Sequence, residues 1–163
     1  MSMIIDGTNG LTFNNATTQA SAGCVLQVVQ SVYSSSVSTT SSTPSASGLT
    51  VSITPKFSTS KILIFASIVC GVNSASSNNG LGYLYIYRGS STSLLQQSIR
   101  FYTYVTSNGV YMESVDNMIY LDSPSTTSST IYNIYFSNNA GTSTQINNSS
   151  GTSSTLTLME IAG

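Results

Sequence analysis

Three acidic residues that lie close together in the sequence could carry chemistry: Glu113, Asp116 and Asp122. Cleavage of a glycosidic bond needs two carboxylates that flank the same substrate. Glu113 and Asp116 are three positions apart, so on one strand their side chains point to opposite faces and cannot flank one substrate. We therefore expect Glu113 or Asp116 to form an ion pair with Arg88 or Arg100, within the chain or between subunits, and we expect no catalytic pair.

The 163-residue chain contains no histidine, which removes imidazole-based catalysis and the commonest zinc ligand. Its two cysteines, Cys24 and Cys70, follow no short metal-binding or redox spacing, and each sits beside apolar residues. We expect both to be small buried apolar side chains, with a disulfide as the alternative. The sequence thus predicts a protein that is not an enzyme and has no metal site and no cofactor.

Tyrosine, which occurs ten times, is the most suggestive residue for binding. Tyr83, Tyr85 and Tyr87 alternate with aliphatic residues, so they share one face of a predicted strand whose other face is also apolar. We predict that these three tyrosines lie at an interface between subunits, together with Arg100, which precedes two aromatic residues. The alternative is glycan binding, because a flat ring that carries a hydroxyl can stack on a sugar.

A second group of polar and aromatic residues flanks the predicted turn at residues 107–109. Side chains beside such a turn are expected at the surface of the domain. We predict a receptor-binding surface, with a surface polysaccharide as the ligand, at Tyr102, Tyr104, Asn108 and Tyr111.

Short segments rich in β-branched and aromatic residues recur along the chain between polar turns, and none shows a sustained helical repeat. Residues 62–70 are apolar on both faces, which predicts a central strand covered from both sides. The expected strands are 25–33, 49–54, 62–70, 81–87, 94–104, 110–121, 131–136 and 155–161, with a short edge strand near Val37. This pattern predicts an all-β, jelly-roll-like antiparallel β-sandwich over residues 24–163.

Residues 1–23 differ from the rest, because turn residues occur every few positions and apolar residues are too few for a core. We interpret this segment as an extended N-terminal arm that serves docking or oligomerisation. The apolar residues available to bury against a partner are Ile4, Ile5, Leu11 and Phe13.

Charged residues make up only 6% of the chain, with four Lys and Arg against five Asp and Glu. The net charge of −1 offers no cluster of cations for nucleic acid or for an anionic membrane. Hydrophobic residues reach 40%, so the chain should fold rather than remain disordered. The sequence contains no stretch of about 18 apolar residues, so we expect no membrane insertion, and the N-terminus encodes no secretion signal.

Several segments resemble small bacteriophage virion structural proteins of the tail-fibre and capsid-decoration type. The arm resembles their linking segments, and three patterns in the domain are similar to theirs: residues 51–55 with 60–63, residues 114–117 through 121–124, and residues 154–160. The resemblance implies a β-sandwich, often trimeric, displayed on a tail fibre or on the capsid. It carries over no catalytic or metal-binding residue.

The residues and the resemblance together lead to one functional hypothesis and one alternative. The first is a non-enzymatic phage virion surface protein, a tail-fibre or knob-like component that attaches the phage to its host. The alternative is a capsid decoration or cement protein, also called a head fibre, that stabilises the phage head. In both, the expected partners are further copies in a homotrimer and other virion proteins, and assembly takes place in the cytoplasm of the bacterial host.

Overall fold

The structure is a computed structural model, which describes residues 4–6, 10–12, 18–19, 24–74, 80–101 and 110–163. Side chains are described over 24–74, 80–99 and 111–163. Throughout these residues the chain forms strands and connecting turns, and no helix occurs among them. The strands are β1 (Ile4–Asp6), β2 (Gly10–Thr12), β3 (Thr18–Gln19), β4 (Val25–Tyr33), β5 (Val37–Thr39), β6 (Ser45–Ile53), β7 (Lys61–Ser74), β8 (Gly80–Arg88), β9 (Thr92–Phe101), β10 (Val110–Asp122), β11 (Thr130–Ala140), β12 (Ser143–Ile146) and β13 (Ser154–Ile161).

Two antiparallel sheets form the body of the molecule. One is a six-stranded sheet of order β4-β13-β7-β12-β5, in which β10 pairs with the opposite edge of β7. Strand β7 is long enough to serve two neighbours on one edge: residues 61–67 pair with β13, and residues 70–73 pair with β12. The other sheet has four strands in the order β6-β11-β8-β9.

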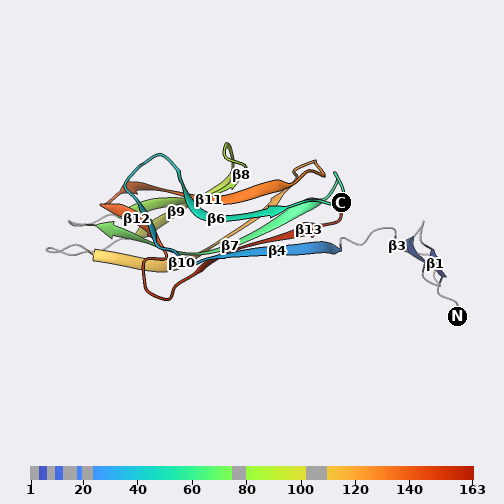
Figure 1. The fold of residues 1–163 in the computed structure, drawn as a ribbon, viewed down its shortest axis with the longest axis horizontal. Coiled ribbons are helices and arrows are strands. Elements are labelled where there is room, and N and C mark those ends of the chain that lie inside the picture. Colours follow the sequence, from blue (N-terminus) through green and yellow to red (C-terminus); the bar gives the residue numbers. More distant parts are fainter. Residues whose placement is uncertain (1–3, 7–9, 13–17, 20–23, 75–79, 102–109) are drawn as a thin grey trace.

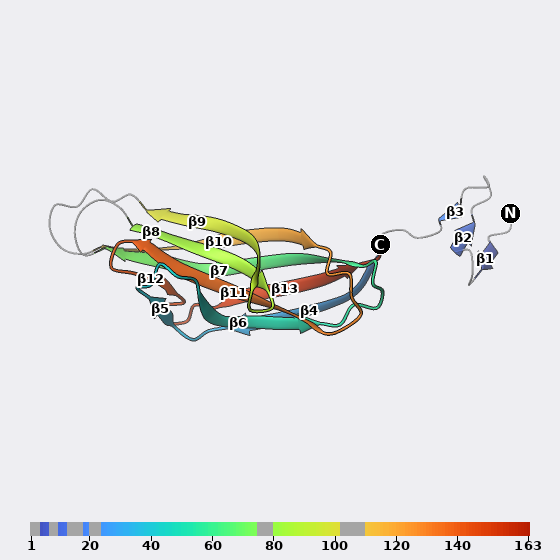
Figure 2. The ribbon, with the colours of Figure 1, turned by 90° about the horizontal axis from the view of Figure 1, so that it is seen from above.

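The two sheets stack as the layers of a sandwich, which Figure 1 shows from the side and Figure 2 from above. The predicted all-β antiparallel β-sandwich is confirmed. Strand β4 has the predicted bounds, β5 forms around Val37, and β6 begins four residues earlier than expected, at Ser45. Strand β12 was not predicted, because its polar sequence STQI lacks the β-branched runs that mark the other strands.

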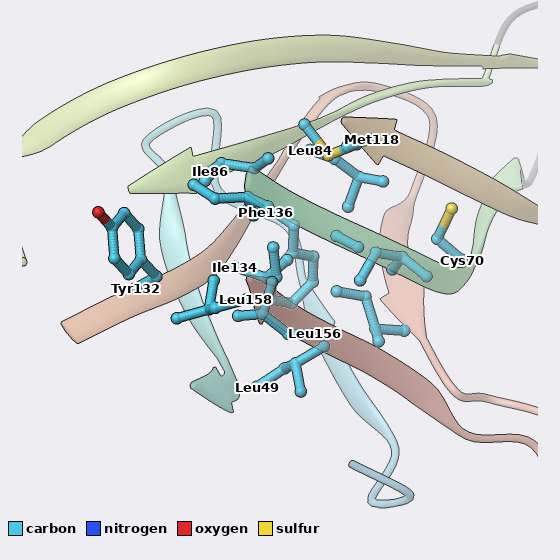
Figure 3. Packing of buried hydrophobic residues seen from close by; sticks show 14 of the residues in the cluster. Leu49, Cys70, Leu84, Ile86, Met118, Tyr132, Ile134, Phe136, Leu156 and Leu158 are labelled. Carbon is cyan, nitrogen blue, oxygen red and sulfur yellow. The ribbon is translucent and has the colours of Figure 1, made fainter. Parts of the chain in front are cut away.

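The core lies between the layers, because alternate side chains of each strand point inward. In β7 the even-numbered residues are buried, and the largest of them are Ile62, Ile64 and Ile68. Figure 3 shows side chains of both sheets meeting in this space. The labelled members of the cluster are Leu49, Cys70, Leu84, Ile86, Met118, Tyr132, Ile134, Phe136, Leu156 and Leu158.

Strand β6 contains a bulge at Gly48, where its pairing with β11 shifts register. Gly48 has a φ of +92°, and the Ser47 hydroxyl donates to the Ile134 carbonyl oxygen at 2.8 Å within the bulge. The ring of Tyr33 lies over Gly48, where an added Cβ would come within 2.9 Å of ring atoms. Only glycine fits both the backbone conformation and the space.

The described residues of the N-terminal arm pair with one another as a three-stranded antiparallel sheet, β1-β2-β3. The sequence did not predict this local pairing. Figures 1 and 2 show the three strands apart from the sandwich, beyond the start of β4.

Both cysteines are free thiols. The prediction of a buried side chain is confirmed for Cys70 and wrong for Cys24, which is exposed. Cys24 immediately precedes β4, the outermost strand on its side of the sheet, so no neighbouring strand covers it.

Candidate functional site

Arg88 of β8 forms its ion pair with Asp122 of β10, and not with Glu113 or Asp116 as expected, with an Nη1 to Oδ2 distance of 2.9 Å. The Tyr132 hydroxyl donates to the same carboxylate at 2.7 Å. Asp122 is buried, and it faces the core from the six-stranded sheet, whereas Arg88 and Tyr132 belong to the other sheet. Burial, followed by this hydrogen bond, raises the pKa of Tyr132 far above its ordinary value. The three side chains connect the two layers and have a structural role.

The other two acids lie on opposite faces of β10, as predicted. Asp116 points inward, where the Cys70 thiol donates to it at 3.1 Å and the Ser114 hydroxyl at 2.7 Å. Burial, and then the hydrogen bond to Asp116, raises the pKa of the Cys70 thiol well above its usual range, which suppresses thiolate chemistry. Glu113 points outward, where it accepts hydrogen bonds from Tyr111 and Ser149.

Glu160 of β13 is a buried carboxylate that was not among the predicted site residues. It accepts hydrogen bonds from Gln27 Nε2 at 2.6 Å and from the backbone N–H of Lys56 at 2.7 Å. Burial alone would raise the pKa of Glu160, but the hydrogen-bond donors around it outweigh burial and hold the pKa below its ordinary value. Its position in the alternating sequence STLTLMEI placed it on the inward face, and this was the available signal.

The predicted receptor-binding group falls largely outside the described residues, since Tyr102, Tyr104 and Asn108 lie there. Tyr111 is described at the start of β10, where it is half-buried and its hydroxyl donates to Glu113 at 2.6 Å. Burial, followed by this hydrogen bond, raises the pKa of Tyr111. The receptor-binding role of these residues stays a prediction.

The predicted docking residues of the arm are placed only by their backbone. Ile4 and Ile5 lie in β1 and Leu11 in β2, while Phe13 lies outside the described residues. Ile5 and Leu11 occupy paired positions in the small sheet. Their docking role stays a prediction.

The structure brings the three tyrosines of β8 together on the outer face of the four-stranded sheet, where Tyr135 of β11 joins them. The rings of Tyr87 and Tyr135 are stacked with centroids 4.4 Å apart, and Tyr85 meets Tyr87 edge-on at 6.1 Å. The ring centroids of Tyr83 and Tyr85 are 6.3 Å apart. We call Tyr83, Tyr85, Tyr87 and Tyr135 the tyrosine surface. The backbone of Arg100 pairs with Leu81 at the edge of the same sheet.

The neighbours of the tyrosine surface are neutral polar side chains. By strand register, Ser98 lies opposite Tyr83, Gln96 opposite Tyr85 and Asn133 opposite Tyr87. Tyr85 is buried, and its hydroxyl forms a hydrogen bond of 3.1 Å with the buried Ser137 hydroxyl, which fixes the ring. The half-buried rings of Tyr83, Tyr87 and Tyr135 lie beside amide and hydroxyl groups, and this arrangement suits an uncharged polar ligand.

The outer face of the six-stranded sheet carries many exposed apolar side chains, interspersed with polar ones such as Gln30 and Asn117, and no described segment covers it. In β10 the outward residues Val115 and Ile119 are each 58% exposed, and Phe65 of β7 is 38% exposed between β10 and β13. We call this surface the apolar face: Val28, Val32, Leu63, Phe65, Val69, Val115, Ile119, Leu121 and Met159. A shallow hollow of about 400 Å³ at its centre is lined by Phe65, Ser67, Asn117, Ile119, Thr155 and Thr157.

The apolar face explains why residues 62–70 are apolar on both faces of their strand. Strand β7 is central in its sheet and its even-numbered residues are covered by the four-stranded sheet, as expected. Its odd-numbered residues, such as Leu63 and Phe65, receive no second layer from the described part of the chain. The sequence therefore identified a surface that needs cover, and the described segments do not provide that cover.

Within the described residues, no group of three or more cysteine, aspartate and glutamate side chains could hold a metal ion. The same residues include no helix long and apolar enough to cross a membrane.

No protein-family model matches the chain, and no curated protein matches it. Among solved structures, the infectious bursal disease virus VP2 subviral particle is similar with a TM-score of 0.34 and 14% identity, over 92% of this chain and 36% of that one. The Gt strain of the same virus gives a TM-score of 0.32 and 15% identity, over 93% of this chain and 42% of that one. The chain thus spans about two fifths of the length of these proteins.

Proposed function

We propose that the chain is a non-enzymatic structural protein of a bacteriophage particle, which works as a homo-oligomer on the particle surface and takes part in host attachment. The observation that carries the proposal is the apolar face, an extended sheet surface with few charged residues that the described part of the chain leaves open. Contiguous apolar surface of this kind marks an interaction site. It supports a subunit whose fold is completed by assembly, and the resemblance to phage virion proteins supports the particle.

Host attachment is supported by the tyrosine surface on the opposite side of the sandwich. Its ring faces and neutral amide and hydroxyl neighbours suit the uncharged sugars of an envelope polysaccharide. A subunit that uses one sheet for assembly and the other for ligand binding can present several copies of the ligand site together. Several weak sites then act with high avidity.

Capsid decoration remains the alternative, and the N-terminal arm favours it. The described arm strands form their own small sheet and pair with no strand of the sandwich. Such a sheet can dock on a capsid protein while the sandwich stays free.

The test is a cryo-EM reconstruction of purified particles of the phage that encodes this chain, combined with mass spectrometry of the same particles. We expect the chain in the particles, with sandwich density at the distal end of a tail fibre or knob. Density on the head shell, with residues 1–23 across capsid proteins, would replace attachment by decoration. Particles that lack the chain would refute the proposal.

A further inference from the structure

We infer that the apolar face is a self-association surface, covered by the apolar face of a second copy whose strands run antiparallel to the first across a two-fold axis. The inference rests on the homo-oligomer of the proposed function and names its contact surface, partner and geometry. It also moves the subunit interface from the tyrosines of β8 to β4, β13, β7 and β10.

The size of the face is sufficient for a specific interface. Four strands about 4.8 Å apart and about eight residues long at 3.3 Å per residue cover roughly 500 Å². The continuation of β7 and β10 past β13 adds about 200 Å². Two copies therefore bury on the order of 1,000 to 1,400 Å², which reaches the lower range of stable protein interfaces.

The side chains of the face suit tight packing between two sheets. Val28, Val32, Val115 and Ile119 are β-branched and stiff at χ1, so they lose little rotamer freedom when they are buried. The hollow beside Phe65 can accept a side chain of the partner copy. Face-to-face sheets with these residues repeat the packing of the core on the other side of β7.

The charged residues near the two ends of the apolar face favour an antiparallel orientation of the two copies. Lys61 lies at one end of the outward row of β7, and Glu113 lies beside Gly71 near the other end. Antiparallel strands bring Lys61 of one copy toward Glu113 of the other, twice in each pair. Three copies arranged around an axis parallel to the strands would instead gather three lysines at one end and three glutamates at the other, which is unfavourable.

The tyrosine surface is the weaker candidate for a subunit contact. Its rings pack on one another, and the Tyr85 hydroxyl is already bonded within the chain, so less apolar area is left to bury. The apolar face, by contrast, carries strongly exposed aliphatic residues on two strands at its opposite edges, β4 and β10.

The first experiment is sedimentation velocity on the full chain across about 1 to 100 µM. We expect a dimer, and we expect Ile119→Asp to weaken dimerisation by at least about a hundredfold, because it buries an unpaired charge. Ile131→Asp is the matched control, since Ile131 is 43% exposed on the outer face of the other sheet. It should leave the dimer unchanged, and circular dichroism should show that both variants are folded.

The second experiment tests the antiparallel orientation by charge exchange. Lys61→Glu and Glu113→Lys should each weaken the dimer by about fivefold at low salt, and the double variant should restore most of the affinity. Failure of the double variant to restore affinity, while both single variants weaken the dimer, would overturn the antiparallel geometry.

The two proposals can fail separately. A wild-type chain that sediments as a monomer at all concentrations, or as a trimer insensitive to Ile119→Asp, would overturn this inference, as would virion density with a different protein over the apolar face. Each of these results is compatible with a place in the phage particle, which only the composition of the particle tests.

Discussion

At the scale of single residues, the Arg88, Tyr132 and Asp122 group joins the two layers through an ion pair and a hydrogen bond to the same carboxylate. Asp122→Asn keeps the volume but removes the charge that Arg88 and Tyr132 contact, and its amide presents a donor to them. The side chain of Arg88 is 32% exposed, so water recovers part of the loss. We expect the free energy of unfolding to fall by about 2 kcal/mol in urea titrations.

A double-mutant cycle separates the energy of the Arg88–Asp122 contact from the other effects of each substitution on stability. Arg88→Met and Asp122→Asn should together cost less than the sum of the single variants, with a coupling energy of about 1 kcal/mol. Strictly additive losses would contradict a direct contribution of the pair to stability.

Glu160 predicts how stability depends on pH. Its pKa in the folded chain lies below the ordinary value of 4.5, so the folded state favours the ionised form. The stabilisation is therefore fully present above pH 4.5 and is lost as the pH falls through the lower pKa of the folded state. Glu160→Gln should lower stability by about 2 kcal/mol at pH 7 and reduce the loss on acidification.

Urea titrations of the wild-type chain and the Glu160→Gln variant from neutral to acidic pH measure this dependence. Because the amide introduced by the substitution does not titrate at these pH values, the gap between the two stability curves should narrow toward acid. A constant gap across the range would show that Glu160 does not contribute through its charge.

At this scale the sequence predicted the relative positions of nearby side chains, but it did not predict the hydrogen-bond donors that surround a buried side chain. The three-residue spacing of Glu113 and Asp116 placed them on opposite faces, and the rarity of arginine limited the partners of Asp122. The donors around Glu160 come from β4 and from the turn after β6, more than 100 residues away in the case of Lys56. No local pattern encodes such a contact.

At the scale of elements, Gly48 fixes the bulge of β6 against Tyr33. Gly48→Ala combines a left-handed backbone with a Cβ within 2.9 Å of the ring, and we expect it to lower the free energy of unfolding by about 3 kcal/mol. Gly89→Ala is the control, because Gly89 also has a positive φ, +66°, but its Cβ would meet nothing within 4 Å.

Thermal or urea unfolding of the two variants separates the backbone strain of a left-handed residue from the steric clash with Tyr33. Gly89→Ala should cost only about 1 kcal/mol, the penalty of the left-handed conformation itself. Equal losses in the two variants would mean that Tyr33 yields and that the bulge tolerates a side chain.

The strands themselves were largely predictable, because period-two alternation and β-branched runs are local signals. The pairing was not, since β7 has two neighbours on one edge and one of them, β12, is a polar segment. The sequence of residues 62–70 predicted apolar cover on both faces, and the structure shows that β13, β12 and β10 surround β7 within one layer. Only the arrangement of all the strands shows that the second face is open.

At the scale of the whole molecule, association through the apolar face couples stability to concentration. If only folded chains pair, raising the protein concentration stabilises the folded state by mass action. We expect the melting temperature of the wild-type chain to rise by several degrees between about 1 and 100 µM, while that of Ile119→Asp stays constant. Differential scanning calorimetry at matched scan rates measures both, and parallel behaviour of the two chains would contradict the coupling.

The free edge of strand β10 bears on whether further chains can add to the dimer. Among the described strands its backbone pairs only with β7, so its other edge could template lateral addition of strands into an open filament. Its inward carboxylates, Asp116 and Asp122, are satisfied by Gln97 and Arg88 of the facing sheet of the same chain. A β10 that is drawn away to extend another sheet would leave both charges without these donors. Withdrawal of β10 from its own sheet is therefore unfavourable, although the outward side chains Val115, Ile119 and Leu121 of this strand are exposed.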